Sequence, residues 1–176
     1  MEGILIISGP RTGSTYLGNE LSKNYDFKFI SEPRDIKHLK KVKCIKLIPF
    51  KTVNYTLDDI VDFSKRFSNI ILLQRKDKIA QAESWQALHA MKYLRHSDHL
   101  KWQAGNIEPK YPLEFYADRI KNLDEKIEWL SEKLNIPISF YEDIYYEGKV
   151  PYDLNFKPDL SKRLRQEQKK KKQRYL

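Results

Sequence analysis

Apolar residues in this chain occur in short runs, separated by segments in which they recur every three or four positions. The apolar runs at 4–7 and 69–73 are typical of strands buried on both faces of a parallel sheet. Weaker runs at 27–30, 42–48 and 136–141 predict three further strands. The chain therefore contains the strand signals of a five-stranded sheet.

Helical patterns fill most of the intervals between these runs. They predict helices that begin near Ser14 and that span about 56–67, 77–93 and 113–134. The segment from Thr56 to Asp59 has the form of a capping box, which opens a helix. Alternating strands and helices predict an α/β fold, in which helices cover both faces of a parallel sheet through right-handed connections.

The length of 176 residues suits one continuous hydrophobic core. We expect residues 1–157 to form a single domain, with an irregular connection at 96–112, and residues 158–176 to form a basic C-terminal tail. Between Lys162 and Arg174 there are eight basic residues and one acidic residue, so this segment holds seven of the nine net positive charges. The nearly neutral remainder argues against a nucleic-acid partner.

Other features of the sequence concern location and metals. No apolar stretch approaches the length of a membrane span, and the N-terminus lacks the pattern of a secretory signal. The single cysteine, Cys44, cannot form an internal disulfide, which favours a reducing, cytoplasmic location. Cys44, His96 and His99 lack the spacing of zinc ligands, so we expect no metal site.

The segment 8–15, between the first strand and the first helix, has the composition of a P-loop-like phosphate loop. Gly9 and Gly13 allow the backbone to approach an oxyanion closely, and Ser14 and Thr15 add hydroxyl donors. A helix N-terminus behind such a turn attracts phosphate. A strand–helix turn without a ligand is the simpler alternative.

This turn differs from a Walker A motif. Only three residues separate the two glycines, and Ser14 occupies the place of the lysine. No acidic residue at a later strand end stands out as a partner for magnesium. The pattern therefore disfavours a magnesium-dependent NTPase, although another nucleotide-dependent transferase or kinase remains an alternative.

Four segments together resemble a known family. The run 10–17 reads P-R-T-G-S-T-Y-L and resembles the 5′-phosphosulfate loop of sulfotransferases, in particular the carbohydrate enzymes and the bacterial trehalose-type glycolipid enzymes. Glu32-Pro33 resembles the segment that carries their carboxylate base, and residues 72–85 resemble their 3′-phosphate segment. Residues 141–144, Y-E-D-I, resemble a motif that closes a late strand.

The resemblance implies an enzyme that transfers a sulfuryl group from 3′-phosphoadenosine-5′-phosphosulfate to a hydroxyl acceptor, such as a carbohydrate or glycolipid, and releases adenosine 3′,5′-bisphosphate. It implies that Arg11 holds the 5′-phosphate and offsets charge on the bridging oxygen, and that Arg75 and Ser84 bind the 3′-phosphate. The residues expected to assist Arg11 through their backbone amides are Thr12, Gly13, Ser14 and Thr15.

The same resemblance suggests a general base for the acceptor hydroxyl. Glu32 is the first candidate and Asp35 is the second. Lys46, in the middle of the predicted third strand, corresponds to a lysine of the family and either points at the active site or lies at the edge of the sheet face.

The acceptor itself is not identified by the sequence. Residues 35–41, 85–112 and 145–157, where the resemblance is weakest, are expected to determine it. Trp85 and His89 are candidates for the acceptor pocket, although a core position for Trp85 and a helix-surface position for His89 are the more ordinary expectations. The oligomeric state is left open.

Overall fold

The computed structural model describes residues 3–25, 28–33, 36, 39, 44–47, 55–91 and 109–144. Several predictions made above lie outside this part of the chain: those on Asp35, His96, His99, the side chain of Lys46, the connection at 96–108, the segment 145–157 and the basic tail at 158–176.

The centre of the molecule is a five-stranded parallel sheet with the strand order β2-β3-β1-β4-β5. The strands are β1 (Ile4–Ser8), β2 (Phe29–Ser31), β3 (Cys44–Leu47), β4 (Asn69–Gln74) and β5 (Ile138–Phe140). β1 is the middle strand, and all five of its residues are buried. This burial explains why its sequence is a continuous apolar run rather than an alternating one.

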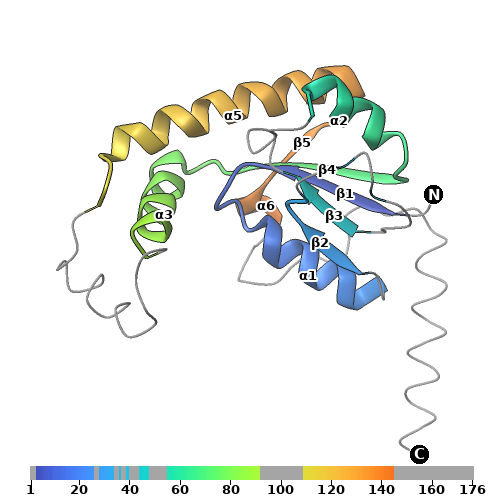
Figure 1. Cartoon of the computed structure of the whole chain (residues 1–176), viewed down its shortest axis with the longest axis horizontal. Coiled ribbons are helices and arrows are strands. Elements are labelled where there is room, and N and C mark those ends of the chain that lie inside the picture. The colour runs from blue at the N-terminus through green and yellow to red at the C-terminus, as the bar shows by residue number, and fades with distance from the viewer. Residues whose placement is uncertain are drawn as a thin grey trace, which may run out of the picture.

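Helices cover both faces of the sheet, as Figure 1 shows. They are α1 (Ser14–Tyr25), α2 (Leu57–Ser64), α3 (Lys78–Met91), α5 (Leu113–Leu134) and α6 (Tyr141–Ile144). α2 and α5 lie on one face, and α1 and α6 lie on the other. α3 packs against the N-terminal half of α5, beyond the end of the sheet.

Alternate side chains of β1 serve the two faces. Leu5 and Ile7 belong to a core cluster with residues of α2 and α5, whereas Ile4 and Ile6 belong to a cluster with residues of α1 and α6. The partners of the first cluster are Ile60, Phe63, Ile127 and Leu130, and those of the second are Leu17, Leu21 and Ile144. The predicted α/β fold is therefore confirmed in this part of the chain, as a parallel sheet between two helical layers.

Two of the differences from the predicted element boundaries have a clear cause in backbone hydrogen bonds. α2 was predicted to reach about residue 67 but ends at Ser64, and the N–H groups of Arg66 and Phe67 close turns on Phe63 and Ser64 instead. β5 was predicted to begin at Ile136, but the N–H of this residue donates to Ser131 O and finishes the end of α5. Apolar residues at the end of a helix thus imitated the start of a strand.

The route of the chain creates a topological switch point at one edge of the sheet. β1 leads into α1 on one face, whereas the neighbouring strand β4 leads through α3 to α5 on the other face. The segments that follow β1 and β4 therefore diverge. In open parallel sheets, such a switch point at the carboxyl ends of the strands is the usual place for a ligand.

Within the described residues, every helix is too short or too polar to cross a membrane.

Candidate functional site

The turn between β1 and α1 has a shape held by its own side chains. Thr12 is buried, and its hydroxyl donates to the carbonyl of Gly9 at 3.0 Å and lies 3.3 Å from the hydroxyl of Ser14. Arg11 and Gly13 both adopt positive φ angles, of 59° and 73°. The carbonyl of Gly13 accepts from the N–H of Leu17 at 3.0 Å, so helical hydrogen bonding begins at once after the turn.

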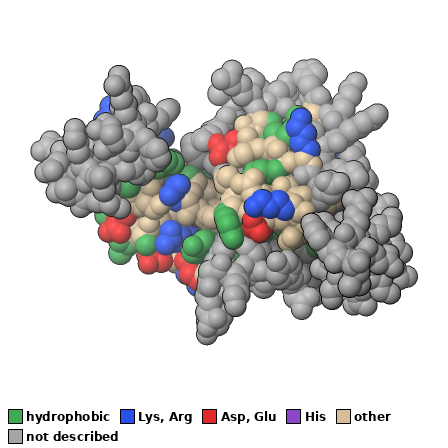
Figure 2. Space-filling model, turned by 90° about the horizontal axis from the view of Figure 1, so that it is seen from below, with side chains coloured by type: hydrophobic (Ala, Val, Ile, Leu, Met, Phe, Trp, Pro, Cys, Tyr) green, Lys and Arg blue, Asp and Glu red, His purple; other side chains and the backbone are tan. Residues whose placement is uncertain are grey.

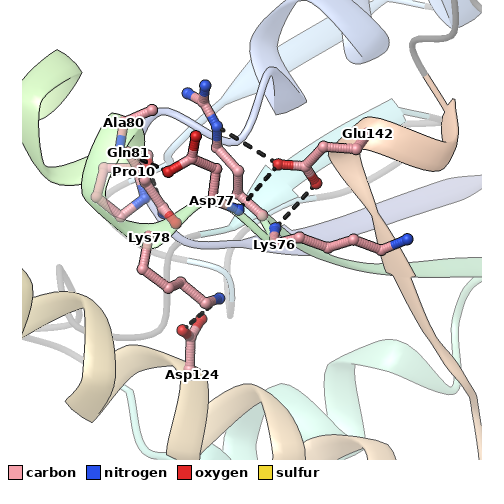
Figure 3. A network of polar contacts seen from close by, with 9 residues as sticks. Pro10, Lys76, Asp77, Lys78, Ala80, Gln81, Asp124 and Glu142 are labelled. Atoms are coloured by element: carbon pink, nitrogen blue, oxygen red, sulfur yellow. Dashed lines mark hydrogen bonds and ion pairs between the residues drawn. The ribbon is translucent and has the colours of Figure 1, made fainter.

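Helix α3 packs directly on this turn. The Gln81 side chain is buried, and its Nε2 donates to the carbonyl of Pro10 at 2.8 Å, as Figure 3 shows. A Cβ atom on Gly9 would lie only 3.3 Å from that nitrogen, so a larger residue at this position would force Gln81 to move. Gly9 therefore serves the close approach of α3 to the turn.

A second contact joins the turn to α3. The Nε of Arg11 donates to the hydroxyl of Ser84 at 2.8 Å, across 73 positions of sequence. The structure thus brings together two residues that the sequence assigns to separate phosphate contacts. Among the described residues, Ser84 forms its hydrogen bond with Arg11 and Arg75 forms its ion pair with Glu142, so the predicted binding of one phosphate by Arg75 and Ser84 together stays a prediction.

Arg75 follows the end of β4, one strand away from the β1–α1 turn. Its Nε lies 3.7 Å from Oε1 of Glu142, and its guanidinium carbon lies 5.1 Å from the centre of the Tyr141 ring. Glu142 also accepts hydrogen bonds from the backbone N–H groups of Lys76 and Asp77, at 2.9 and 3.1 Å (Figure 3). The segment between β4 and α3 is therefore tied to the start of α6.

The electrostatics of Glu142 agree with this geometry. Burial by itself raises the pKa of the Glu142 carboxyl, but the N–H groups of Lys76 and Asp77 and the charge of Arg75 outweigh it and leave the pKa below its usual value. The carboxylate is thus held in its charged form. Sequence reasoning did not assign a role to Glu142, although the Y-E-D-I segment marked its position.

Glu32 lies at the same edge of the sheet, immediately after β2, with a positive φ of 53°. Its charge reaches the buried hydroxyl of Tyr55: burial first, and then the Glu32 carboxylate, raise the pKa of Tyr55 to about 12. β2 is two strands from β1, which corresponds to about 10 Å. Sequence reasoning missed Tyr55, which lies beside the capping box of α2.

Lys46 lies in β3, between the strands that carry Glu32 and the turn. Its backbone pairs in register with Ile6 of β1 and with Ser31 of β2. The predicted position within a strand is thus confirmed, whereas the direction of its side chain stays a prediction.

The two residues suggested for an acceptor pocket both contact α5. Trp85 packs edge-on against Tyr116, with ring centres 5.6 Å apart, and it lines a cavity of about 300 Å³. His89 is half-buried: Nδ1 lies 2.9 Å from the Tyr116 hydroxyl, and its ring stacks on Tyr111. His89 is thus partly exposed on α3, and Tyr111 and Tyr116 cover part of its ring. The other residues that line the cavity are Phe115, Asp118, Arg119, Asn122 and Leu123.

One face of the molecule shows how charge is distributed on it. On the face shown in Figure 2, Lys and Arg side chains lie apart from one another, among acidic, apolar and neutral surface. Among the residues that the structure describes, no three His, Cys, Asp or Glu side chains lie close enough together to hold a metal ion.

The fold and this geometry define the class of protein: a parallel α/β domain with a switch point. Arg11, Glu32 and Arg75 follow the carboxyl ends of its strands, at one edge of the sheet. No family model, curated protein or solved structure matches the chain.

Proposed function

We propose that this protein is a sulfotransferase, which moves a sulfuryl group from 3′-phosphoadenosine-5′-phosphosulfate to a hydroxyl of a carbohydrate or glycolipid. One observation carries the proposal. The hydrogen bond from Arg11 to Ser84 joins the segment that resembles a 5′-phosphosulfate loop to the segment that resembles a 3′-phosphate site. Two sequence segments that both resemble binding sites for the same sulfate donor are thus in contact.

The donor is expected to lie across the switch point between β1 and β4. Arg11 and the backbone N–H groups of residues 12–15 would hold its 5′-phosphate, at the N-terminus of the 12-residue helix α1. In this role the turn acts as a P-loop-like phosphate site. Arg75 follows the adjacent strand and would bind the 3′-phosphate. Because β1 and β4 are adjacent strands, about 4.8 Å apart, the two proposed phosphate contacts follow neighbouring strand ends.

The transfer itself needs a base and a stabilised leaving group. Glu32 would accept the proton of the acceptor hydroxyl while its oxygen forms a bond to sulfur. The bond between sulfur and the oxygen of the 5′-phosphate breaks at the same time, and the electron pair stays on the phosphate. Arg11, with Lys46 from β3, would offset that charge. Because in-line transfer depends on position and charge, these residues suffice for the step without any covalent intermediate.

The proposal predicts strong preference for a 3′-phosphate. Titration calorimetry should show that adenosine 3′,5′-bisphosphate binds far more tightly than adenosine 5′-phosphate. Arg75→Ala should remove most of this difference, about 1.5–3 kcal/mol for a contact to a charged group. Arg119→Ala, which removes an arginine from α5 instead, is the matched control and should leave the difference intact.

Equal affinity of the unchanged protein for the two nucleotides would contradict the proposal. The alternative is another nucleotide-dependent transferase or kinase with the same strand–turn–helix arrangement. Magnesium distinguishes the two, because the alternative expects nucleotide binding or activity to fail in EDTA and to return when magnesium is added.

A further inference from the structure

Glu142 occupies a position that the proposed chemistry has not used. Its carboxylate receives the two successive N–H groups of Lys76 and Asp77, directly after Arg75. Its side chain is about one-third exposed, and that of Arg75 is about one-fifth exposed. Both groups therefore lie in a partly desolvated environment, where a fixed charge acts more strongly than at an open surface.

The contact to Arg75 is an ion pair rather than a hydrogen bond. The Nε of Arg75 is buried and lies 3.7 Å from Glu142 Oε1, beyond hydrogen-bond length. Among the described residues, Arg75 Nε has no hydrogen-bond partner. Tyr141 supports the guanidinium from its aromatic face, with 5.1 Å between the guanidinium carbon and the ring centre. The start of α6 thus contacts Arg75 on its Nε side and on one face of the guanidinium, and neither contact uses the terminal nitrogens.

The two acidic residues near Glu142, Asp143 and Asp77, have partners other than Arg75. Asp143, the next residue, forms an ion pair with the side chain of Lys76, and both of these side chains are more than half exposed. Asp77 caps α3 by accepting from the N–H of Ala80 at 2.9 Å. The side chain of Asp77 therefore caps α3, so the contacts of Glu142 are not needed to cap this helix.

We propose that Glu142 is a positioning residue for Arg75: it fixes the turn between β4 and α3 and orients the guanidinium fork toward the 3′-phosphate of the donor. The inference rests on the proposed function and extends it to a residue that does not touch the nucleotide. Recognition of the 3′-phosphate then depends on the docking of α6, although α6 follows β5 and Arg75 follows β4.

The test uses the ratio of the dissociation constant for adenosine 5′-phosphate to that for adenosine 3′,5′-bisphosphate. This ratio should fall roughly tenfold in Glu142→Ala, because a misplaced guanidinium loses its charge-assisted contact. Asp143→Asn is the matched control and should leave the ratio unchanged. In an Arg75→Ala background, Glu142→Ala should have no further effect, because residues that act as a unit do not have additive effects. Glu142→Gln, which keeps the size of the side chain, repeats the test if the alanine variant does not fold.

Each outcome decides the question. If the preference of the unchanged protein is strong and survives in the folded Glu142 variants, or if Glu142→Ala weakens both nucleotides in parallel, the positioning role is wrong and the proposed function stands. A rise in the ratio also overturns the inference, because the carboxylate would then compete with the phosphate for Arg75. If the unchanged protein has no preference, the proposed function and this inference fail together.

Discussion

Two residues of the candidate site hold backbone conformations that their side chains disfavour. Among the described residues other than glycine, positive φ angles occur at Arg11, Glu32 and Asn135. Asn135 ends α5, where asparagine commonly adopts this conformation. Arginine and glutamate do not favour this conformation as asparagine does. The left-handed conformation therefore costs Arg11 and Glu32 about 1–2 kcal/mol each. Strain that persists near strand ends is frequent at functional sites, and here it coincides with two residues chosen from the sequence.

A change at Glu32 tests its proposed role as the base. Glu32→Gln keeps the size of the side chain and its hydrogen bonding, but removes the basicity. Turnover with a hydroxyl acceptor should fall about 10²–10⁴-fold, which is the usual effect of losing a general base. Affinity for adenosine 3′,5′-bisphosphate should change little, because Glu32 directly follows β2, two strands away from β1.

Asp35→Asn is the control for this experiment, and we expect a much smaller loss of turnover. If the two variants exchange behaviour, Asp35 is the base and the Glu-Pro segment was misassigned. Full activity in both variants would place the base elsewhere. His89 would then be the next residue to change, although its contact with the Tyr116 hydroxyl already occupies Nδ1.

At the scale of elements, α1 and β2 pack closely because a glycine lies at their contact. A Cβ atom on Gly18 would lie 2.2 Å from Cε2 of the Phe29 ring, well inside contact distance. Gly18 is buried in α1, and Phe29 packs against the core cluster of that face. The short strand β2, which places Glu32, therefore depends on the absence of a side chain in α1.

Gly18→Ala should lower the free energy of unfolding by roughly 1–3 kcal/mol, in spite of the better helix propensity of alanine, because overpacking displaces Phe29. Denaturation in urea measures this loss. Phe29→Leu in the same protein should restore part of the stability, because the smaller side chain leaves room for the new methyl group. A single Gly18→Ala variant as stable as the parent would show that the ring moves aside freely.

The elements were predictable from sequence where one structural cause dominates. β1, β4 and α5 bury continuous or strictly periodic apolar positions, so their apolar patterns alone indicated them. Phe29–Ser31 forms a strand of three half-buried or exposed residues, and its pattern was correspondingly weak. The start of β5 was misplaced because Ile136 closes α5 by a backbone hydrogen bond, which a hydropathy pattern does not encode.

At the scale of the whole molecule, the sequence indicated which residues gather at the edge of the sheet but not how they pair. Arg11, Glu32 and Arg75 follow strand ends, and parallel strands bring such ends to one edge. The pairings Arg11–Ser84 and Arg75–Glu142 join residues more than sixty positions apart. These pairings depend on how α3 and α6 pack against the rest of the molecule. A local sequence pattern does not determine this packing.

The central place of β1 has a consequence for the lifetime of the site. Its residues pair with β3 on one side and with β4 on the other, and all of them are buried. Amide hydrogens of Leu5, Ile6 and Ile7 should therefore exchange with deuterium only through global unfolding, whereas those of the edge strand β2 should exchange through local opening and much sooner. Exchange of β1 as fast as that of β2 would contradict this. Since the β1–α1 turn begins where β1 ends, one end of the proposed donor site is attached to the slowest-opening part of the molecule, and Glu32 to one of the fastest.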